Sequence, residues 1–557
     1  MVEIAIKQMN STVADFIGNT EIMISAMLEA TDKNVDLLVF PELSLCGYYP
    51  YDLIDEPFFI KQSDKALSDL LEASSQYASL TIIIGTVRKN TGSGKPFYNA
   101  LVVIKSGKII CEYYKQLLPT YNIFDERRHF KPGPASPCLI EVCETKIGLI
   151  ICEDGWNDPA EKYVENPFKD LAKLNPDLVI SINASPSNIG KREQRHTIMS
   201  NLAQRYQLPL LYVNSVGGQD SLVFDGASFA MTAKGDLIYE AESFIASQEY
   251  ISFDSAGFQN ISSHEPVISN NELAFKQIVL GLRDYARRCG FKKMVIGSSG
   301  GIDSALTLAL AREALGSENV IAITMPSVFS STGSVTDSEK LCENLAIKLF
   351  NHPIKALVEQ YSTDFSQTFN NTLKGLTLEN LQARIRGTIL MEYSNEYGAL
   401  LLSTGNKSEI SIGYCTLYGD TNGGLNLLGD LYKTEVYSLS RYINEKAQYE
   451  IIPIDIINKE PSAELAPDQK DTDSLPVYEV LDEILKYLIE GKQLSSDEYR
   501  RVKEYVIQLN KTSIGLVEKI RKMIARNEYK RFQAPPIIRI RARAFGNGRQ
   551  MPIAAKY

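Results

Sequence analysis

The sequence KKMVIGSSGGIDSALTLALAREALG, residues 292–316, joins a short apolar run, a Gly- and Ser-rich turn and an apolar helix. Glycines let the backbone approach an anion closely, and the free N–H groups at the start of the helix point toward it. Asp303 in this turn is best explained as a ligand of Mg²⁺, because a bare carboxylate would repel a phosphate. The string is neither a Walker A loop nor a GxGxxG fingerprint. It predicts a phosphate-binding loop, although a glycine turn that only caps a helix has the same spacing.

Apolar runs on both sides of this loop define the expected fold class. NVIAITMPS (319–327) and ALLLSTGNKSE (399–409) are read as neighbouring strands, which predicts a doubly wound parallel sheet. In the first half of the chain, short apolar runs alternate with helix-like stretches and predict an α/β layered domain. The runs are residues 2–9, 35–40, 80–87, 99–105, 147–154, 177–185 and 209–217, and the helix-like stretches are 19–34, 63–78 and 191–207.

A polar segment, residues 258–272, separates the two halves and is the predicted linker. We therefore expect a first domain over residues 1–257 and a second domain over residues 273–557. The second domain is expected to be mostly helical after about residue 437, with a loop at 465–475.

Composition restricts the classes of function. The chain has 557 residues and a net charge of −10, which disfavours general nucleic-acid binding. It has no run of about 18 apolar residues and no signal-peptide pattern at its start, so neither a membrane nor a secreted location is expected. Eight scattered cysteines without a CxxC pair predict reduced thiols in the cytoplasm. Only four histidines are present, which argues against a His-based metal cluster and a Ser-His-Asp triad.

Three residues of the first half form a candidate catalytic set. Glu42 and Cys152 each follow an apolar run, and Lys115 lies in a loop-like segment. Active-site groups gather at strand ends in α/β sheets. A thiolate can form a thioester with an amide carbonyl, a carboxylate can take its proton, and an ammonium can stabilise the oxyanion. Taken one at a time, each residue could equally be a structural core residue.

The second half resembles known nucleotide-using enzymes. SGGIDS is similar to the loop of the N-type ATP pyrophosphatases, and STGNKSEISIGYCTLYGD (403–420), GDLYKTEV (429–436) and LENLQARIRGTILM (378–391) resemble NAD synthetases. The resemblance implies Mg²⁺ ligands at Asp303 and Glu409, with Glu409 in a strand-end loop. It also implies a deamido-NAD site and an ATP site. The deamido-NAD residues would be Asn380, Glu409 and Lys530, and the ATP residues would be Gly297, Ser298, Ser299, Gly300, Gly301, Ile302, Asp303, Ser304, Thr404 and Lys433.

The first half resembles the nitrilase superfamily in the strings VFPELSLCGY (39–48), YYKQLLPTYNIFDERRHF (113–130) and IGLIICEDGW (147–156). This resemblance implies a nitrilase-like α-β-β-α sandwich. It implies that Tyr121, Ser185 and Lys191 contact a glutamine substrate and that Glu126 helps to orient the amide. FDERRHF could equally form a charged surface turn.

Together the resemblances imply a glutaminase fused to an NAD synthetase. L-glutamine, ATP and deamido-NAD⁺ would be the substrates, and an internal passage would carry ammonia between the sites. A ligase that amidates another carboxylate and a non-catalytic nucleotide-binding scaffold are the alternatives. A homo-oligomer, with an octamer favoured, is expected from the resemblance alone. Two sets of cations remain: Arg384, Arg386, Lys407, Lys433, Lys530 and Arg531 as candidates to hold phosphates, and Arg539, Arg541, Arg543 and Arg549 of the tail, for which a solvated role is favoured over a subunit contact.

Overall fold

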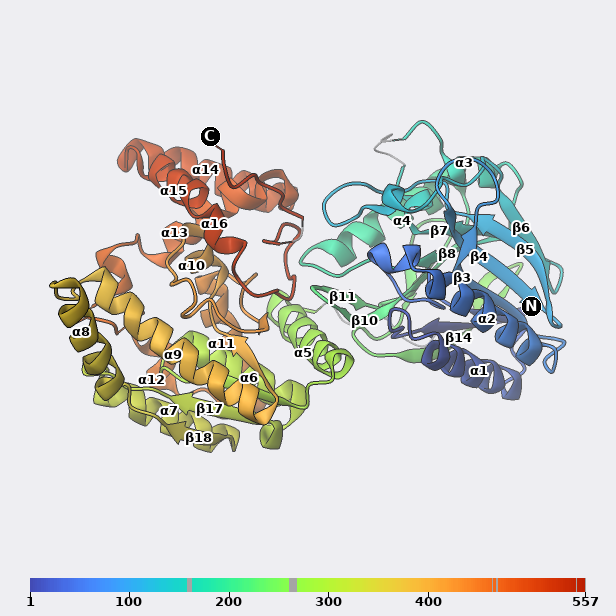
Figure 1. Ribbon diagram of the computed structural model, residues 1–557. Helices are drawn as coiled ribbons and strands as arrows, with labels where there is room; N and C mark the ends of the chain where they lie inside the picture. Colours follow the sequence, from blue (N-terminus) through green and yellow to red (C-terminus); the bar gives the residue numbers. More distant parts are fainter. Residues whose placement is uncertain (158–162, 260–267, 463, 467–468, 547, 556–557) are drawn as a thin grey trace. The chain divides into compact units, whose positions relative to one another are not determined.

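The computed structural model describes residues 1–157, 163–259, 268–462, 464–466, 469–546 and 548–555. The chain forms two compact units, Met1–Val267 and Ile268–Tyr557, and Figure 1 shows the elements of each. Regular structure enters both ends of the predicted linker, because β15 (Gly257–Gln259) pairs with β14 (Ser247–Asp254) and α5 (Asn270–Cys289) starts after its capping residue, Ser269. The middle of that segment, residues 260–267, lies outside the described residues.

The first unit is built on a seven-stranded and a six-stranded sheet. The seven-stranded sheet has the order β15-β14-β1-β2-β3-β4-β5, and the six-stranded sheet has the order β13-β12-β9-β8-β7-β6. The strands of the first sheet not yet given are β1 (Val2–Gln8), β2 (Leu37–Val39), β3 (Thr81–Lys89), β4 (Phe97–Lys105) and β5 (Lys108–Tyr114). Those of the second are β6 (Cys138–Val142), β7 (Thr145–Ile151), β8 (Leu178–Asn183), β9 (Leu210–Asn214), β12 (Phe229–Met231) and β13 (Leu237–Glu240).

The two sheets pack face to face through alternate residues of their strands. Ile6 and Ile83 of the first sheet share one fully buried cluster with Leu149 and Ile180 of the second. The outer face of the first sheet packs against α1 (Phe16–Asp32) and α2 (Pro57–Ser74), and that of the second against α3 (Pro167–Ala172) and α4 (Lys191–Tyr206). The predicted α-β-β-α sandwich is confirmed.

The strands that begin and end this unit lie side by side. β1 pairs antiparallel with β14, with Val2 opposite Phe253 and Gln8 opposite Ser247. β1 also pairs in parallel with β2, so it lies inside the sheet. A separate hairpin of β10 (Val216–Gln219) and β11 (Leu222–Asp225) follows β9.

The second unit contains a five-stranded parallel sheet with the order β18-β17-β16-β19-β20. Its strands are β16 (Lys293–Gly297), β17 (Val320–Thr324), β18 (Lys348–Asn351), β19 (Ala399–Ser403) and β20 (Leu425–Asn426). The chain adds strands on one side of β16, then crosses to the other side at β19. This order confirms the doubly wound prediction and leaves a crevice at the carboxyl ends of β16 and β19.

Helices cover both faces of this sheet. Ile385 and Ile389 of α9 (Leu376–Tyr397) pack against Val295 of β16, whereas the buried neighbours Met294 and Ile296 face the other way, as alternation along a strand requires. The other helices around the sheet are α6 (Ile302–Leu315), α7 (Thr332–Leu345), α8 (Lys355–Phe369), α10 (Lys407–Ile412) and α11 (Lys433–Ala447).

The segment from residue 454 to residue 531 is mostly helical. Its helices are α12 (Ile454–Asn458), α13 (Tyr478–Leu485), α14 (Ser496–Thr512), α15 (Leu516–Arg526) and α16 (Glu528–Arg531). The predicted loop at 465–475 holds one short turn, Asp471–Asp473, and residues 467–468 of it lie outside the described residues. Among the described residues, no helix is both long enough and apolar enough to cross a membrane.

The basic tail is not solvated, and that prediction is wrong. Arg539 and Arg541 are 3% and 5% exposed. Arg543 donates to the Ile489 carbonyl, and Arg549 is paired with Glu528. Acidic side chains from distant segments hold Arg541 and Arg549, whereas Arg539 and Arg543 donate to backbone carbonyls.

Candidate active sites

Cys152 occupies a sharp turn at the end of β7. It is the first residue of η3 (Cys152–Gly155), and its φ of +44° lies in the left-handed region that residues other than glycine seldom adopt. Asp154 holds this turn to the neighbouring loop, because its Oδ1 accepts from the backbone N–H groups of Gln116 (3.0 Å) and Leu117 (2.8 Å). Its Oδ2 accepts from the Tyr113 hydroxyl at 2.8 Å. The segment with Cys152 is therefore fastened to the segment with Lys115.

Lys115 is buried between two carboxylates. Its Nζ lies 2.7 Å from Glu42 Oε1 and 2.8 Å from Glu126 Oε1. Burial alone would lower the pKa of Lys115, but Glu126 and Glu42 raise it well above its usual value, so the side chain stays an ammonium. Burial, opposed by Lys115, raises the pKa of Glu126 to about 7. The Tyr48 hydroxyl also donates to Glu126 Oε1, at 2.8 Å.

Glu42 is oriented by groups from two further segments. Its Oε1 also accepts from Asn99 Nδ2 at 2.7 Å, and its Oε2 accepts from the Ala184 N–H at 2.9 Å. Burial and the Glu42 charge raise the pKa of the Cys152 thiol well above its usual value, although Lys115 opposes them. A thiol with a raised pKa needs a local base before it can attack a carbonyl. The structure thus brings Glu42, Lys115 and Cys152 together, with Glu126 beside them.

The three predicted glutamine contacts surround this set. The Tyr121 hydroxyl lies 3.0 Å from both carboxylate oxygens of Glu153, the residue after Cys152. The ammonium of Lys191 lies 3.8 Å from the centre of the Trp156 ring. Ser185 is buried next to Ala184, at the end of β8. Their contacts with a substrate stay a prediction.

Glu153 is a candidate residue that sequence reasoning missed. Its carboxylate is almost fully buried and accepts from the hydroxyls of Tyr121 and Tyr163. Burial raises the pKa of Glu153, while Lys115 and the tyrosines oppose that rise. Its place directly after Cys152 was the available signal.

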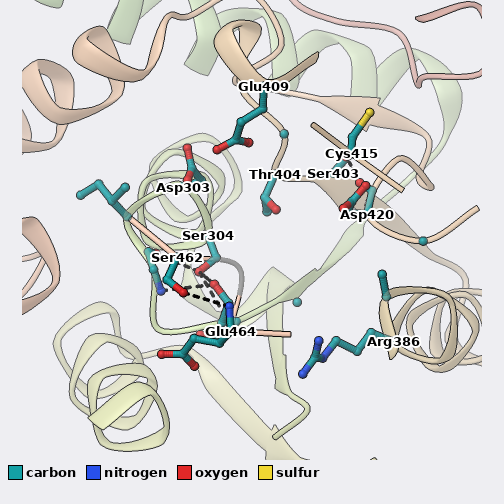
Figure 2. A pocket seen from close by; sticks show the side chains of 18 of the residues that line it. Asp303, Ser304, Arg386, Ser403, Thr404, Glu409, Cys415, Asp420, Ser462 and Glu464 are labelled. Atoms are coloured by element: carbon teal, nitrogen blue, oxygen red, sulfur yellow. Dashed lines mark hydrogen bonds between the residues drawn. The ribbon is translucent and has the colours of Figure 1, made fainter. Parts of the chain in front are cut away.

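The second site is a cavity of about 310 Å³ at the crevice beside β16 and β19. Figure 2 shows Asp303, Thr404 and Glu409 around this cavity. Gly300 has a φ of +75°, and a Cβ there would lie 2.7 Å from the Cα of Ser334, so the turn requires glycine. The predicted residues that line the cavity are Gly297, Ser298, Ser299, Gly301, Ile302, Asp303, Ser304, Thr404, Glu409 and Lys433.

Lys433 joins the two predicted metal ligands. Its Nζ lies 2.5 Å from Asp303 Oδ2 and 3.0 Å from Glu409 Oε1. Burial, opposed by Lys433, raises the pKa of Glu409 to about 7, and the nearby Asp303 adds to this rise. The prediction that Glu409 lies in a loop is wrong, because the residue lies in the first turn of α10. Asn406, which caps this helix, also donates to Asp303 at 2.9 Å.

The donor set at this position fits a magnesium ion. Two carboxylates already gather around one positive charge, the Lys433 ammonium, inside the cavity. Mg²⁺ in nucleotide sites is commonly held by one or two carboxylates together with substrate phosphates. Asp303 and Glu409 meet that requirement, so the role predicted for them is chemically consistent with their surroundings.

The other predicted deamido-NAD residues support the wall of the cavity and do not line it. Lys530 Nζ donates to the carbonyls of Gly413 (2.8 Å) and Cys415 (2.7 Å), and Asn380 Oδ1 accepts from the Thr416 hydroxyl at 2.8 Å. Both side chains therefore form hydrogen bonds with the segment 413–416, of which Tyr414 and Cys415 line the cavity.

The arginine and lysine residues predicted as candidates to hold phosphates differ in their surroundings. Arg386 lines the cavity, and burial lowers its pKa to about 10. Arg384 donates to the Leu417 carbonyl. Lys407 and Arg531 are buried and engaged in structural contacts, so they are not free to hold phosphates.

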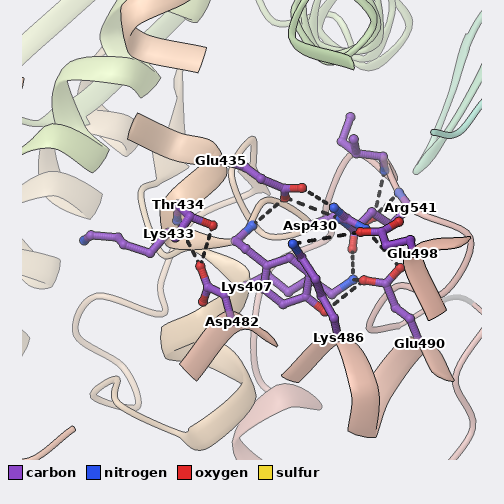
Figure 3. A network of polar contacts seen from close by, with 12 residues as sticks. Lys407, Asp430, Lys433, Thr434, Glu435, Asp482, Lys486, Glu490, Glu498 and Arg541 are labelled. Carbon is purple, nitrogen blue, oxygen red and sulfur yellow. Dashed lines mark hydrogen bonds and ion pairs between the residues drawn. The ribbon is translucent and has the colours of Figure 1, made fainter. Parts of the chain in front are cut away.

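A buried polar network connects the tail with the helices that carry Lys433 and Glu409, as Figure 3 shows. Lys407, two residues before Glu409, lies 2.7 Å from Asp430 and 3.3 Å from Glu490. Asp430 in turn accepts from the N–H groups of Ile540 and Arg541, both at 2.7 Å. The Arg541 guanidinium contacts Glu490 and Glu435, and Glu435 caps the start of α11 beside Lys433.

A second set of cavity residues was also missed by sequence reasoning. The Ser334 hydroxyl contacts Glu464 Oε1 and Lys459 Nζ, both at 2.6 Å. All three line the cavity. Ser334 lies more than 100 residues before Lys459 and Glu464 in the sequence, and no motif connects it with them.

Two protein-family models match this chain, one in each unit. The family model described as carbon-nitrogen hydrolase matches residues 3–248, and the model described as NAD synthase matches residues 274–534. The first unit therefore belongs to the carbon-nitrogen hydrolases. The second belongs to the class of enzymes that complete NAD.

Relatives along the whole chain establish the family. A glutamine-dependent NAD(+) synthetase from Synechocystis sp. is 42% identical over 100% of this chain and 99% of its own length, and one from Thermotoga maritima is 39% identical over 100% and 98%. A solved structure of the synthetase from Acinetobacter baumannii in complex with ADP is 36% identical, with a TM-score of 0.77 over 99% of this chain and 98% of that chain. The chain belongs to the glutamine-dependent NAD(+) synthetases, which are carbon–nitrogen ligases. A ligase for a different carboxylate is not favoured.

Proposed function

We propose that the chain converts deamido-NAD⁺, ATP and L-glutamine into NAD⁺, AMP, diphosphate and L-glutamate, with one reaction in each unit. The observation that carries this proposal is that one chain contains both sites. In the first unit, Lys115 and Glu42 form a buried contact beside Cys152, and in the second unit, Lys433 connects Asp303 of the phosphate loop with Glu409. The family to which the chain belongs supports the same overall reaction.

In the first unit, Glu42 removes the proton of the Cys152 thiol, and the sulfur attacks the side-chain carbonyl carbon of glutamine. The Lys115 ammonium donates to the oxyanion, a charge stabilisation that Glu126 and Glu42 prepare by holding that ammonium in place. Collapse breaks the C–N bond, and the proton from Glu42 leaves with ammonia. Glu42 then deprotonates a water that attacks the thioester carbon; the C–S bond breaks, glutamate leaves, and the Cys152 sulfur takes the proton back from Glu42.

Recognition of glutamine is assigned to the residues around this set. The α-ammonium of the substrate would bind the Glu153 carboxylate, which Tyr121 and Tyr163 orient. Lys191, stacked over Trp156, would bind the α-carboxylate, and Ser185 would donate a hydrogen bond. The assignments to Glu153 and Lys191 match a charge on the substrate with the opposite charge on the protein.

In the second unit, the N–H groups of the turn before α6 and the hydroxyls of Ser299 and Ser304 hold the phosphates of ATP. The nicotinate carboxylate of deamido-NAD⁺ attacks the α-phosphorus, and diphosphate leaves. Ammonia then attacks the activated carbonyl carbon, and AMP leaves. Lys433 would exchange its carboxylate partners for phosphate oxygens. When bound, Mg²⁺ held by Asp303 and Glu409 would neutralise phosphate charge.

The order of the two reactions implies that ammonia passes from the first site to the second without protonation in bulk water. We therefore propose an internal passage for ammonia. We also propose a cytoplasmic location and a homo-oligomeric assembly, with an octamer favoured, which light scattering would measure. An ammonia trap, such as an NADPH-specific glutamate dehydrogenase supplied with 2-oxoglutarate and NADPH, should leave NAD⁺ formation from glutamine almost unchanged.

The Cys152→Ala variant tests the division of labour. Synthesis from glutamine should fall to background, whereas synthesis from added ammonium should stay at the wild-type rate. Cys143→Ala, a change at an exposed cysteine, is the matched control and should keep both activities. The proposal fails if ammonium does not rescue Cys152→Ala, or if that variant still releases glutamate.

A further inference from the structure

Two cysteines outside the proposed catalytic set face each other at one edge of the sandwich. Cys111 lies on β5, the edge strand of the seven-stranded sheet, and Cys138 begins β6, the edge strand of the six-stranded sheet. Their sulfur atoms are 2.8 Å apart. Both side chains belong to the apolar cluster between the sheets, where Cys138 is buried and Cys111 is half-buried.

We propose that Cys111 and Cys138 form a reversible disulfide that joins the two sheets when the chain meets a small-molecule disulfide. Bonded sulfurs in disulfides lie about 2.05 Å apart. Starting from 2.8 Å, the two atoms need to approach by less than 1 Å. The neighbouring backbones are already packed strands, so the bond requires no rearrangement of the fold.

Cys111 is the sulfur that reacts first. The hydrogen bond with Cys138 lowers the pKa of the Cys111 thiol despite its burial, and the same contact together with burial raises the pKa of Cys138. Cys111 is also the more exposed of the two. A half-exposed thiol with a lowered pKa combines the two properties that make a cysteine reactive.

The exchange balances with oxidised glutathione as the oxidant. The Cys111 thiolate attacks one glutathione sulfur, the glutathione S–S bond breaks, and one glutathione thiolate leaves. Cys138 then gives up its proton and attacks the Cys111 sulfur, which releases the second glutathione thiolate. Two cysteine thiols have been oxidised to one disulfide, and one glutathione disulfide has been reduced to two thiols.

The position of the bond connects it with the proposed glutaminase site. Cys111 and Tyr113 share the inward face of β5, which leads directly to Lys115. Cys138 pairs with Leu149 of β7, the strand that ends at Cys152. The disulfide would therefore tie the strand that leads to Lys115 to the hairpin that leads to Cys152. It would prevent this edge of the sandwich from opening.

The test uses the full chain with Cys152→Ala, which removes the thiol expected to be reactive. The protein is equilibrated in buffers with increasing ratios of oxidised to reduced glutathione, free thiols are blocked, and peptides are mapped by mass spectrometry. We expect one linked peptide pair that contains Cys111 and Cys138, and its loss under excess reduced glutathione. Because the bond closes a loop of about 27 residues, the melting temperature of the first unit should rise by roughly 5–10 °C.

Single variants separate this disulfide from other oxidation. Cys111→Ser should abolish both the linked peptide and the rise in melting temperature, and Cys143→Ser should abolish neither. Cys111 is half-buried, so its serine variant is expected to fold. A stable glutathione adduct on Cys111 with Cys138 still free would overturn the proposal. So would a linked peptide that leaves the melting temperature unchanged.

Discussion

Replacing Glu126 with alanine tests whether Lys115 needs both of its carboxylate partners. The change leaves the buried ammonium with Glu42 alone, because the 2.8 Å contact with Glu126 is lost. Removing one partner of a buried ion pair costs about 3–5 kcal/mol. Since Glu42 remains, we use the lower limit. About 3 kcal/mol corresponds to a roughly 150-fold lower kcat/KM for glutamine hydrolysis.

Glutamine at the same position separates charge from hydrogen bonding. Glu126→Gln keeps an oxygen that accepts from Lys115 and Tyr48 but removes the negative charge. Lys115 stays charged, so its hydrogen bond to the glutamine oxygen is still charge-assisted, at about 1.5–3 kcal/mol, and only the attraction between two full charges is lost. We take the lower part of the range for the variant and the upper part for the wild type. The difference of about 1 kcal/mol corresponds to a roughly fivefold lower kcat/KM.

The pH profile gives an independent readout of the same carboxyl group. Burial raises the pKa of Glu126 to about 7, so the ionised form that holds Lys115 becomes populated as the pH rises through 7. We expect kcat/KM for glutamine to rise across this range in the wild type. In Glu126→Gln, which cannot titrate, that limb of the profile should be flat.

The assay is glutamate release, with NAD⁺ formation from ammonium measured on the same samples. Glu112→Gln is the matched control, since it removes a carboxylate of β5 that pairs with Arg88 near the surface, and it should change glutamine hydrolysis by less than twofold. A loss below threefold in Glu126→Ala would show that Glu42 alone positions Lys115. A parallel loss of ammonium-driven synthesis would show that the change acts on the fold.

Three further changes address the second unit, each measured as ammonium-driven NAD⁺ formation with glutamate release as the control that should not move. Arg541→Met should lower kcat by roughly 10- to 100-fold, because the contact that helps to fix Glu435 at the start of α11 is lost, and Arg541→Lys should restore part of it. Gly300→Ala should raise KM for ATP at least tenfold, because a Cβ there meets the backbone of Ser334. Asp303→Asn should abolish synthesis, and retention of activity at ordinary Mg²⁺ concentrations would contradict its role as a metal ligand.

The sequence was sufficient to predict the sheets and the groups at their ends. The buried residues of β3, 81–87, are β-branched except for one glycine, and the glycine turn at 297–301 marks the first strand of the parallel sheet. Glu42 follows β2 of the seven-stranded sheet and Cys152 follows β7 of the six-stranded sheet. Their places at strand ends marked each as a candidate site residue, although 110 residues of sequence and two different sheets separate them. Lys115 was placed with them by resemblance and by the chemistry of an oxyanion.

Contacts between distant polar residues could not be predicted. The tail arginines have the composition of a solvated segment, and the acidic partners of Arg541 lie in α11 and at Glu490, while that of Arg549 is Glu528. β5 was missed because an edge strand alternates exposed and half-buried residues and carries charges at Lys108 and Glu112. Glu409 was assigned to a loop because α10 has only six residues, too few for a helical period.

The pairing of β1 with β14 has a consequence for biosynthesis. The antiparallel partner of the first strand is synthesised about 240 residues later, so the seven-stranded sheet cannot be completed until nearly half of the polypeptide has left the ribosome. Until then, the apolar face of β1 has to be shielded by chaperones or by transient collapse. In the completed sheet, the same pairing places the first and last parts of this unit on adjacent strands. A domain whose ends lie close together can be fused to an unrelated domain without disturbing its interior.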